Sequence, residues 1–381
     1  MDRLTNVIQQ YAWGSNVLLA TLCGRAPAEL PEAEVWMGAH PVAPSRIGKR
    51  SLLELIEAAP EASLGPRVLQ RFGTKLPYLL KLLAAAQPLS IQAHPSARQA
   101  REGFEQENAL GLPLTAPNRN YRDPNHKPEL LCALTPFKAL CGFRSVNDTA
   151  SLLEALGQET LAAGVKDGLK ATFEGLMQLP RAEAVRLVDA VVASCRQYVG
   201  RWEPECGNAL VLQKLYPGDI GVVSALLLNY LELKPGEAIY LPAGNLHAYL
   251  GGLGVEVMAN SDNVLRGGLT PKHVDVAQLL KVLDFRAGPV PIVHPVLEGE
   301  EEVYLTPAAE FRLSRFTLDR RSAQPPRRGA EILVCTEGKV IVGSVELKSG
   351  ESVWIPAAEG LYALAGQGVV YRVTVNDETE H

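Results

Sequence analysis

LKPGEAIYLPAGNLHAYLGG, at Leu233–Gly252, is the stretch that decides the predicted fold, because it recurs in altered form as LKSGESVWIPAAEGLYALAG at Leu347–Gly366. Aligned without gaps, the two stretches share eight residues at equivalent positions. Each contains a Lys-x-Gly-Glu turn, a short strand, a Pro-Ala turn and a second strand. A repeated unit of this kind predicts two related β-sandwich or jelly-roll barrels. The alternative is chance similarity between two turn-rich β segments.

The same repeat indicates which barrel carries chemistry. His247 in the first copy corresponds to Leu361 in the second. If His247 binds a metal, the C-terminal barrel has no such site and is purely structural. Substituting Leu361→Ala would then cost about 2–5 kcal/mol if that leucine is buried.

Outward from the repeat, the chain changes character twice. Residues 1–146 alternate short apolar runs with Pro and Gly and are predicted to form mainly strands, with one helix at 97–108. Residues 147–215 carry apolar residues at helical spacing after the cap-forming Ser145, which predicts a helical insertion. From Tyr216 onward, strands are predicted to continue to the end. The four predicted parts are 1–146 and 216–285, which form one barrel, the helical insertion 147–215, and the C-terminal barrel 286–381.

Composition excludes several classes of protein. A chain of 381 residues with 47% hydrophobic residues and mean hydropathy +0.02 predicts two or three packed domains. The net charge of −5 disfavours binding to nucleic acid or an anionic membrane. The N-terminus has no signal-peptide pattern, and no apolar run approaches the length of a membrane span. Six scattered cysteines without a CxxC pair are predicted to be free thiols, so we expect a cytoplasmic protein.

Two short segments carry residues suited to a metal. In LSIQAHPS, starting at Leu89, Gln92 and His94 share one face of a predicted strand. In YRDPNHKPELL, Lys127 and Glu129 share a face after an Asp-Pro-Asn turn. Each signal is weak alone, because a hydrogen-bonded strand pair and a plain Lys–Glu ion pair explain them equally well.

A third segment, running from Leu241 to Lys272, adds the remaining polar groups. Its Pro-x-Gly-x-x-His pattern resembles the cupin signature, in which a turn delivers a histidine, here His247, to a metal. Tyr249 shares a face with His247, and a dense polar run follows. That run contains Glu256, Asp262, Asn263, Arg266 and Lys272. Neither a phosphate loop nor a dinucleotide fingerprint is present.

Gln92, His94, Glu129 and His247 together form a ligand set that suits zinc. Two imidazoles and a carboxylate are typical zinc ligands, and the amide oxygen adds a weaker neutral fourth. One anionic ligand against a dication leaves a site of net charge +1, which keeps electrophilic character.

These segments resemble the type I mannose-6-phosphate isomerases. The matching stretches extend from near the start to about residue 285, so the resemblance covers some three quarters of the chain. They are YAWGS from Tyr11, EVWMGAHP from Glu34, LSIQAHPS from Leu89, YRDPNHKPEL from Tyr121, YLPAGNLHAYLGG from Tyr240 and NSDNVLRGGLTPKHVD from Asn260.

The resemblance implies a mainly β protein with two cupin-type barrels and an α-helical insertion. It implies a monomer that binds one zinc ion per chain and converts a small sugar phosphate. The family's zinc ligands fall on Gln92, His94, Glu129 and His247, and its catalytic arginine falls on Arg266. The chain is too short for the appended nucleotidyltransferase domain of the bifunctional type II enzymes.

Isomerisation through an enediol(ate) requires acids and bases beside the zinc and the guanidinium. Lys127, Asp262 and His94 are candidates for ring opening, and Glu256 is the candidate base for the carbon-bound proton. Ser90, Lys272, Tyr249 and Trp13 are expected to bind the substrate, with Ser90 and Lys272 at its phosphate. Two rivals are a metal-dependent cupin oxygenase, which the Gln ligand fits poorly, and a non-catalytic sugar-binding cupin.

Overall fold

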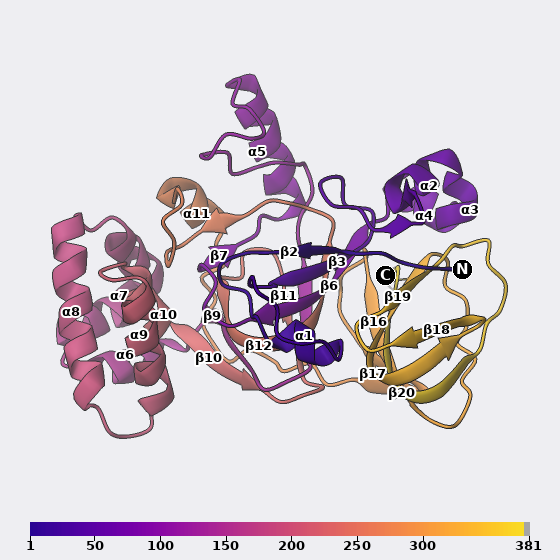
Figure 1. Ribbon diagram of the computed structural model, residues 1–381. Coiled ribbons are helices and arrows are strands. Elements are labelled where there is room, and N and C mark those ends of the chain that lie inside the picture. The colour runs from indigo at the N-terminus through magenta and orange to yellow at the C-terminus, as the bar shows by residue number, and fades with distance from the viewer. Residues whose placement is uncertain (377–381) are drawn as a thin grey trace.

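The computed structural model describes residues 1–376 and separates into three regions (Figure 1). A bundle of helices lies at one side, a ten-stranded antiparallel sheet lies in the middle, and an eight-stranded antiparallel sheet lies at the other side. A two-stranded ribbon joins β4 (Arg46–Ile47) to β5 (Arg50–Ser51). The antiparallel sheets agree with the predicted β character, but helices account for about as many residues as strands.

The central sheet is organised around its longest strand, β12 (His247–Ala259). The second half of β12 pairs with β6 and β8, and its first half pairs with β9 and β7. One long strand therefore connects two groups of strands and brings their polar residues together. The other strands are β2 (Val7–Gln9), β3 (Glu34–Met37), β6 (Tyr78–Ala85), β7 (Gln92–Ala93), β8 (Glu129–Ala133), β9 (Phe137–Phe143), β10 (Leu228–Leu233), β11 (Ala238–Leu241) and β13 (Leu265–Arg266).

The C-terminal sheet has the order β1-β19-β17-β20-β16-β15-β14, with β18 paired to β17. Its first strand comes from the N-terminus of the chain, so residues at both ends contribute to it. Its strands are β1 (Asp2–Arg3), β14 (Val296–Glu298), β15 (Glu301–Tyr304), β16 (Arg312–Asp319), β17 (Glu331–Val342), β18 (Val345–Lys348), β19 (Ser352–Ile355) and β20 (Leu364–Thr374).

The two copies of the repeat have matching turns. In the first, the backbone N–H of Lys234 donates to the Glu237 carboxylate at 2.8 Å, and Gly236 has φ +88°. In the second, the N–H of Lys348 donates to the Glu351 carboxylate at 2.8 Å, and Gly350 has φ +86°. The positive φ explains why both copies keep glycine. Identical hydrogen bonds at equivalent positions argue against chance similarity.

The copies diverge at the position of His247. His247 is fully buried at the start of β12, whereas Leu361 is 72% exposed and lies before β20 begins. The condition for the predicted cost of 2–5 kcal/mol, a buried Leu361, is therefore not met, because the second copy stays irregular for three residues longer.

Truncating Leu361 should consequently have little effect. We expect Leu361→Ala to change the free energy of unfolding by no more than about 0.5 kcal/mol, as for an ordinary surface substitution. Urea denaturation of the two proteins measures this. A loss of 2 kcal/mol or more would show that the side chain is covered in solution.

The predicted helical insertion is present as four helices, and a fifth follows it. They are α6 (Val146–Ala155), α7 (Glu159–Met177), α8 (Arg181–Gln197), α9 (Glu203–Leu215) and α10 (Gly221–Leu226). Ser145 caps α6 as expected, since its hydroxyl accepts from the N–H of Asp148 at 3.2 Å. Strands were predicted from Tyr216 onward, which is wrong for α10 and for α11 (Val276–Val282). Within residues 1–376, no helix has the length and apolarity needed to cross a membrane.

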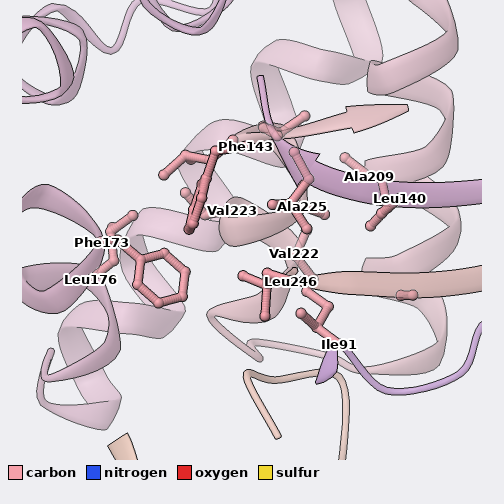
Figure 2. Packing of buried hydrophobic residues seen from close by; sticks show 14 of the residues in the cluster. Ile91, Leu140, Phe143, Phe173, Leu176, Ala209, Val222, Val223, Ala225 and Leu246 are labelled. Carbon is pink, nitrogen blue, oxygen red and sulfur yellow. The ribbon is translucent and has the colours of Figure 1, made fainter. Parts of the chain in front are cut away.

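The helices pack on the central sheet through a large apolar cluster (Figure 2). Phe173 and Leu176 of α7 approach Phe143 of β9, while Ile91 and Leu246 extend the cluster toward the site described below. Helix α10 contributes only buried residues, so its sequence is apolar all round and lacks the periodicity that identifies a surface helix.

The first 146 residues contain more helix than predicted. The expected helix is present as α5 (Ala97–Ala109), and two of the expected strands are present as β6 and β8. Of the strand predicted at 89–93, only the two residues of β7 form. Four helices were missed, namely α1 (Leu18–Leu22), α2 (Leu52–Ala58), α3 (Pro60–Leu64) and α4 (Pro66–Phe72).

One apolar core joins the two sheets. It combines Leu82 and Val255 of the central sheet with Ile332, Trp354 and Val373 of the C-terminal sheet, all buried. The C-terminal sheet therefore braces the sheet that carries the polar site. All six cysteines are free thiols, as predicted.

Candidate active site

Three side chains from three strands or strand ends converge in the central sheet. His94 follows β7, Glu129 begins β8 and His247 begins β12. The Nε2 atoms of His94 and His247 each lie 3.4 Å from Oε2 of Glu129. All three residues are at most 2% exposed, and their ligand atoms lie close enough to share one metal ion.

The hydrogen bonds of the two imidazoles show that neither Nε2 atom carries a hydrogen toward Glu129. Nδ1 of His94 is 2.7 Å from the carbonyl oxygen of Asn263, and Nδ1 of His247 is 2.9 Å from that of Asn245. A carbonyl oxygen only accepts, so each Nδ1 carries the hydrogen and each Nε2 presents a lone pair. Both Nε2 atoms and Oε2 of Glu129 are buried without a hydrogen-bond partner.

Such an arrangement is unfavourable without a cation, because two lone pairs and a carboxylate oxygen face one another away from water. Burial also lowers the pKa of His94 to about 4, which keeps this imidazole neutral as a ligand must be. The three residues therefore fit a metal ion better than they fit a hydrogen-bonded core.

Around Glu129, the electrostatic partner is Lys127. Its Nζ lies 3.0 Å from Oε1 of Glu129, the oxygen turned away from the histidines. Burial raises the pKa of Glu129, but the Lys127 ammonium outweighs burial and holds it well below its usual range. The plain ion pair considered from sequence is thus present, and it coexists with the metal-type geometry at the other carboxylate oxygen.

A pocket of about 650 Å³ opens above this centre. Ten of the twelve residues predicted for the site line it, and the two histidines lie beneath. The ten are Trp13, Ser90, Gln92, Lys127, Glu129, Tyr249, Glu256, Asp262, Arg266 and Lys272. Gln92 lies directly opposite both His247 and Arg266 in the sheet register, which places the fourth predicted ligand between the metal-type centre and the predicted catalytic arginine.

A second charged group in the pocket was missed by the sequence analysis. Lys81 Nζ lies 3.0 Å from Oε2 of Glu256 and 3.3 Å from Oε1 of Glu34, and Tyr249 donates its hydroxyl to Glu256 at 2.8 Å. Burial lowers the pKa of Lys81, but the two carboxylates outweigh it and raise the pKa overall. One signal could have identified this residue, since Lys81 is the single charge in the apolar strand YLLKLLAA.

Positive charge gathers at another side of the pocket. Burial, followed by repulsion from Arg122, lowers the pKa of Arg266, while burial, Arg266 and Arg122 lower that of Lys272. Arg266 forms no ion pair within the described part of the chain. Asp262 lies four residues earlier in the chain but is not the partner of Arg266, since its Oδ1 lies 3.4 Å from Nε2 of His40. Arg122, Arg266 and Lys272 form no ion pair among residues 1–376, and cations placed in this way favour an anionic ligand.

The central sheet thus carries a buried centre of two histidines and one carboxylate, and cationic side chains line the pocket beside it. This arrangement is that of a protein with a metal-type site in a cationic pocket. Residues 1–146 match the family model described as phosphomannose isomerase type I, catalytic domain. The mannose-6-phosphate isomerase of Salmonella typhimurium is 41% identical, over 98% of this chain and 99% of its own length. The human mannose-6-phosphate isomerase is 37% identical, over 74% and 72%.

Solved structures agree. A crystal structure of mannose 6-phosphate isomerase bound with zinc and yttrium has a TM-score of 0.93 and 41% identity, with 99% of both chains covered. The apo form from Salmonella typhimurium gives the same values. The chain therefore belongs to the mannose-6-phosphate isomerase family. This confirms the family predicted from the motifs and identifies the chain as an isomerase.

Proposed function

We propose that this chain is a zinc-dependent enzyme that interconverts D-mannose 6-phosphate and D-fructose 6-phosphate through a cis-enediol(ate). The proposal rests on one observation. Two Nε2 lone pairs and a carboxylate oxygen face one another with no hydrogen between them, beneath a pocket in which Arg122, Arg266 and Lys272 form no ion pair in the described part of the chain. The similar structure that holds zinc supports the choice of metal. The names of the relatives support the choice of substrate.

His94, Glu129 and His247 would hold the zinc, with Gln92 as the fourth ligand. Bound there, zinc would supply Lewis-acid polarisation of the substrate oxygens. The carbonyls of Asn263 and Asn245 orient the two imidazoles, and Lys127 orients the carboxylate.

Glu256 is the group we propose for moving the proton between C2 and C1. Burial raises its pKa, with Lys81 opposing, and a raised pKa suits a carboxylate that must take up and return a proton near neutral pH. The Tyr249 hydroxyl and Lys81 fix its orientation from two sides. Asp262, with 41% of its side chain exposed, would serve proton transfer at the sugar oxygens during ring opening.

We assign the cationic side chains of the pocket to the two ends of the substrate. Arg266 lies opposite Gln92 in the sheet, so we assign it to the developing enediolate. A guanidinium is always protonated and offers forked donors to neighbouring oxygens. Lys272 lies farther along the same pocket wall and is assigned to the phosphate together with Arg122, while Ser90 adds a hydroxyl and Trp13 contributes to the wall.

We further propose that the two sheets are cupin-type barrels. Residues 1–146 and 216–285 would form the first barrel, residues 147–215 the helical insertion, and the chain from residue 286 onward the second barrel. The matching turns of the repeat support this relation, with the exception that β1 pairs with β19 and so adds the first residues to the C-terminal sheet. We also propose that the protein is a monomer. The net charge of −5 supports the absence of nucleic-acid binding, and the pocket of about 650 Å³ supports a small sugar phosphate as substrate.

Arg266→Ala tests the proposed role of the guanidinium. We expect kcat on mannose 6-phosphate to fall about 10²-fold or more, as when one preorganised donor is removed from a charge-stabilising site. KM, zinc content and melting temperature should change little, because Arg266 forms no ion pair within residues 1–376 and is not a ligand. Arg266→Lys, which keeps the charge but loses the fork, should be intermediate.

Two outcomes would count against this account. Near-normal kcat in Arg266→Ala would reduce Arg266 to a structural residue. Absence of turnover by the unaltered zinc-loaded protein would refute the proposed function itself.

A further inference from the structure

His40 is a buried imidazole that the mechanism above does not use. It follows β3 in the sequence GAHP, is 3% exposed, and packs edge-on against Trp36 with ring centroids 4.7 Å apart. The backbone N–H of Val42 donates to its Nδ1 at 3.3 Å. Because an N–H faces Nδ1, that nitrogen carries the lone pair, so in the neutral ring the hydrogen is on Nε2.

The hydrogen on Nε2 faces Asp262 in the pocket wall. Nε2 lies 3.4 Å from Oδ1 of Asp262, a distance typical of catalytic contacts that tighten only when substrate binds. The backbone N–H of Asp262 donates to Oδ2 of Asp123 at 2.7 Å. Asp262 is thus anchored through its backbone, and the one ion-pair contact of its carboxylate among the described residues is the 3.4 Å contact of Oδ1 with His40.

We propose that His40 is a positioning residue that acts through Asp262, donating from its Nε2–H to Oδ1 so that the other carboxylate oxygen is turned to the substrate. This inference rests on the proposed function, because it assigns Asp262 a proton transfer at the sugar oxygens. His40 also lines the pocket, and the role proposed for it is exercised through Asp262. The alternative is a purely structural role, in which the contact between His40 and Asp262 only holds two loops together.

The charges around Asp262 allow the two alternatives to be separated by pH. Burial raises the pKa of Asp262, while the His40 contact, Lys127 and Arg122 lower it, with a net lowering. The other groups that face it are the Tyr11 hydroxyl and the Asp123 carboxylate. Removing the His40 donor therefore raises the pKa of Asp262. The carboxylate would then be protonated at a higher pH, so the acidic limb of the kcat profile moves upward in pH.

The test compares His40→Leu with His40→Gln, since a glutamine amide can place an N–H near the position of Nε2. We expect His40→Leu to lower kcat at least about 10-fold, as for loss of a group that orients a functional side chain. KM and zinc content should be nearly unchanged, and the acidic limb should shift upward. His40→Gln should restore most of the rate and the limb. In an Asp262→Asn background, His40→Leu should cause no further loss.

Equal losses in both variants with an unmoved acidic limb would overturn the proposal, as would additive losses in the Asp262→Asn background. If His40→Leu fails to fold, ¹⁵N NMR of the unaltered protein decides instead, and a hydrogen on Nδ1 of His40 would contradict the assignment. Failure of the proposed function is separately visible. Even if the protein does not turn over mannose 6-phosphate, ¹³C NMR can measure the pKa of Asp262 in all three proteins. The proposal expects the same pKa in the unaltered protein and in His40→Gln, and a higher pKa in His40→Leu.

Discussion

Glu129→Gln should remove the zinc and lower kcat by at least about 10³-fold, although glutamine has the same shape. Among residues 1–376, Oε2 of Glu129 is the one anionic atom within ion-pair distance of the two Nε2 atoms, and all three groups are buried. A neutral amide leaves the metal without a charge to balance it, and Lys127 loses its carboxylate partner. Losing several kcal/mol of Lewis-acid stabilisation corresponds to about three powers of ten in rate.

Elemental analysis and the isomerase assay measure both parts of this prediction. The matched control is Glu232→Gln on β10, where the Glu232–Lys138 pair is more than half exposed on both sides. This control should keep zinc and activity, because an exposed pair contributes about 0–1 kcal/mol. A Glu129→Gln variant that retains stoichiometric zinc and near-normal kcat would contradict the assigned ligand.

Arg372→Leu should destabilise the protein by about 3–5 kcal/mol, the usual cost of removing one partner from a buried ion pair. Arg372 is fully buried in β20 and forms two bonds of 2.9 Å to Glu331, itself fully buried. A third bond of 3.2 Å reaches Glu301. Leucine would fill part of the space but would leave both carboxylates short of a partner away from water.

The matched control is Lys339→Leu on the neighbouring β17, whose ion pair with Glu346 is about half exposed on both sides. This substitution should cost no more than about 1 kcal/mol. Denaturant unfolding followed by tryptophan fluorescence gives both values. Because the C-terminal sheet carries no proposed ligand, kcat per folded Arg372→Leu molecule should remain normal. A normally stable Arg372→Leu variant, or one that folds but loses zinc, would contradict this assignment.

The sequence predicted the features that depend on local pattern. Turn residues with special backbone angles, such as Gly236 and Gly350, recur visibly, so the repeat and its strands could be recognised. His94, Glu129 and His247 lie in motifs that indicate metal binding from the sequence alone, without knowledge of the distances between them. Their meeting in space depends on the long strand β12, which pairs with both β7 and β8, two strands that are far from it in the chain.

Other features depend on tertiary contacts and left no local signal. Asp262 lies four residues before Arg266, and proximity in sequence suggested a pair, yet its partner His40 comes from a loop more than two hundred residues earlier. Helix α10 is buried on every side, so it has no polar face to reveal its period. Lys81 and Glu256 stabilise each other across neighbouring strands, a pairing that becomes visible only once the register is known.

The most direct test of the central claim is a zinc titration of the metal-stripped protein with mannose 6-phosphate in D₂O, followed by NMR. The account predicts that fructose 6-phosphate forms in proportion to added zinc and reaches its maximum near one ion per chain, by the count of one four-ligand site. It also predicts solvent deuterium at C1 of the product, because the enediol(ate) route passes the proton through a base. Full activity in the metal-free protein, or maximal activity with iron in place of zinc, would contradict the account.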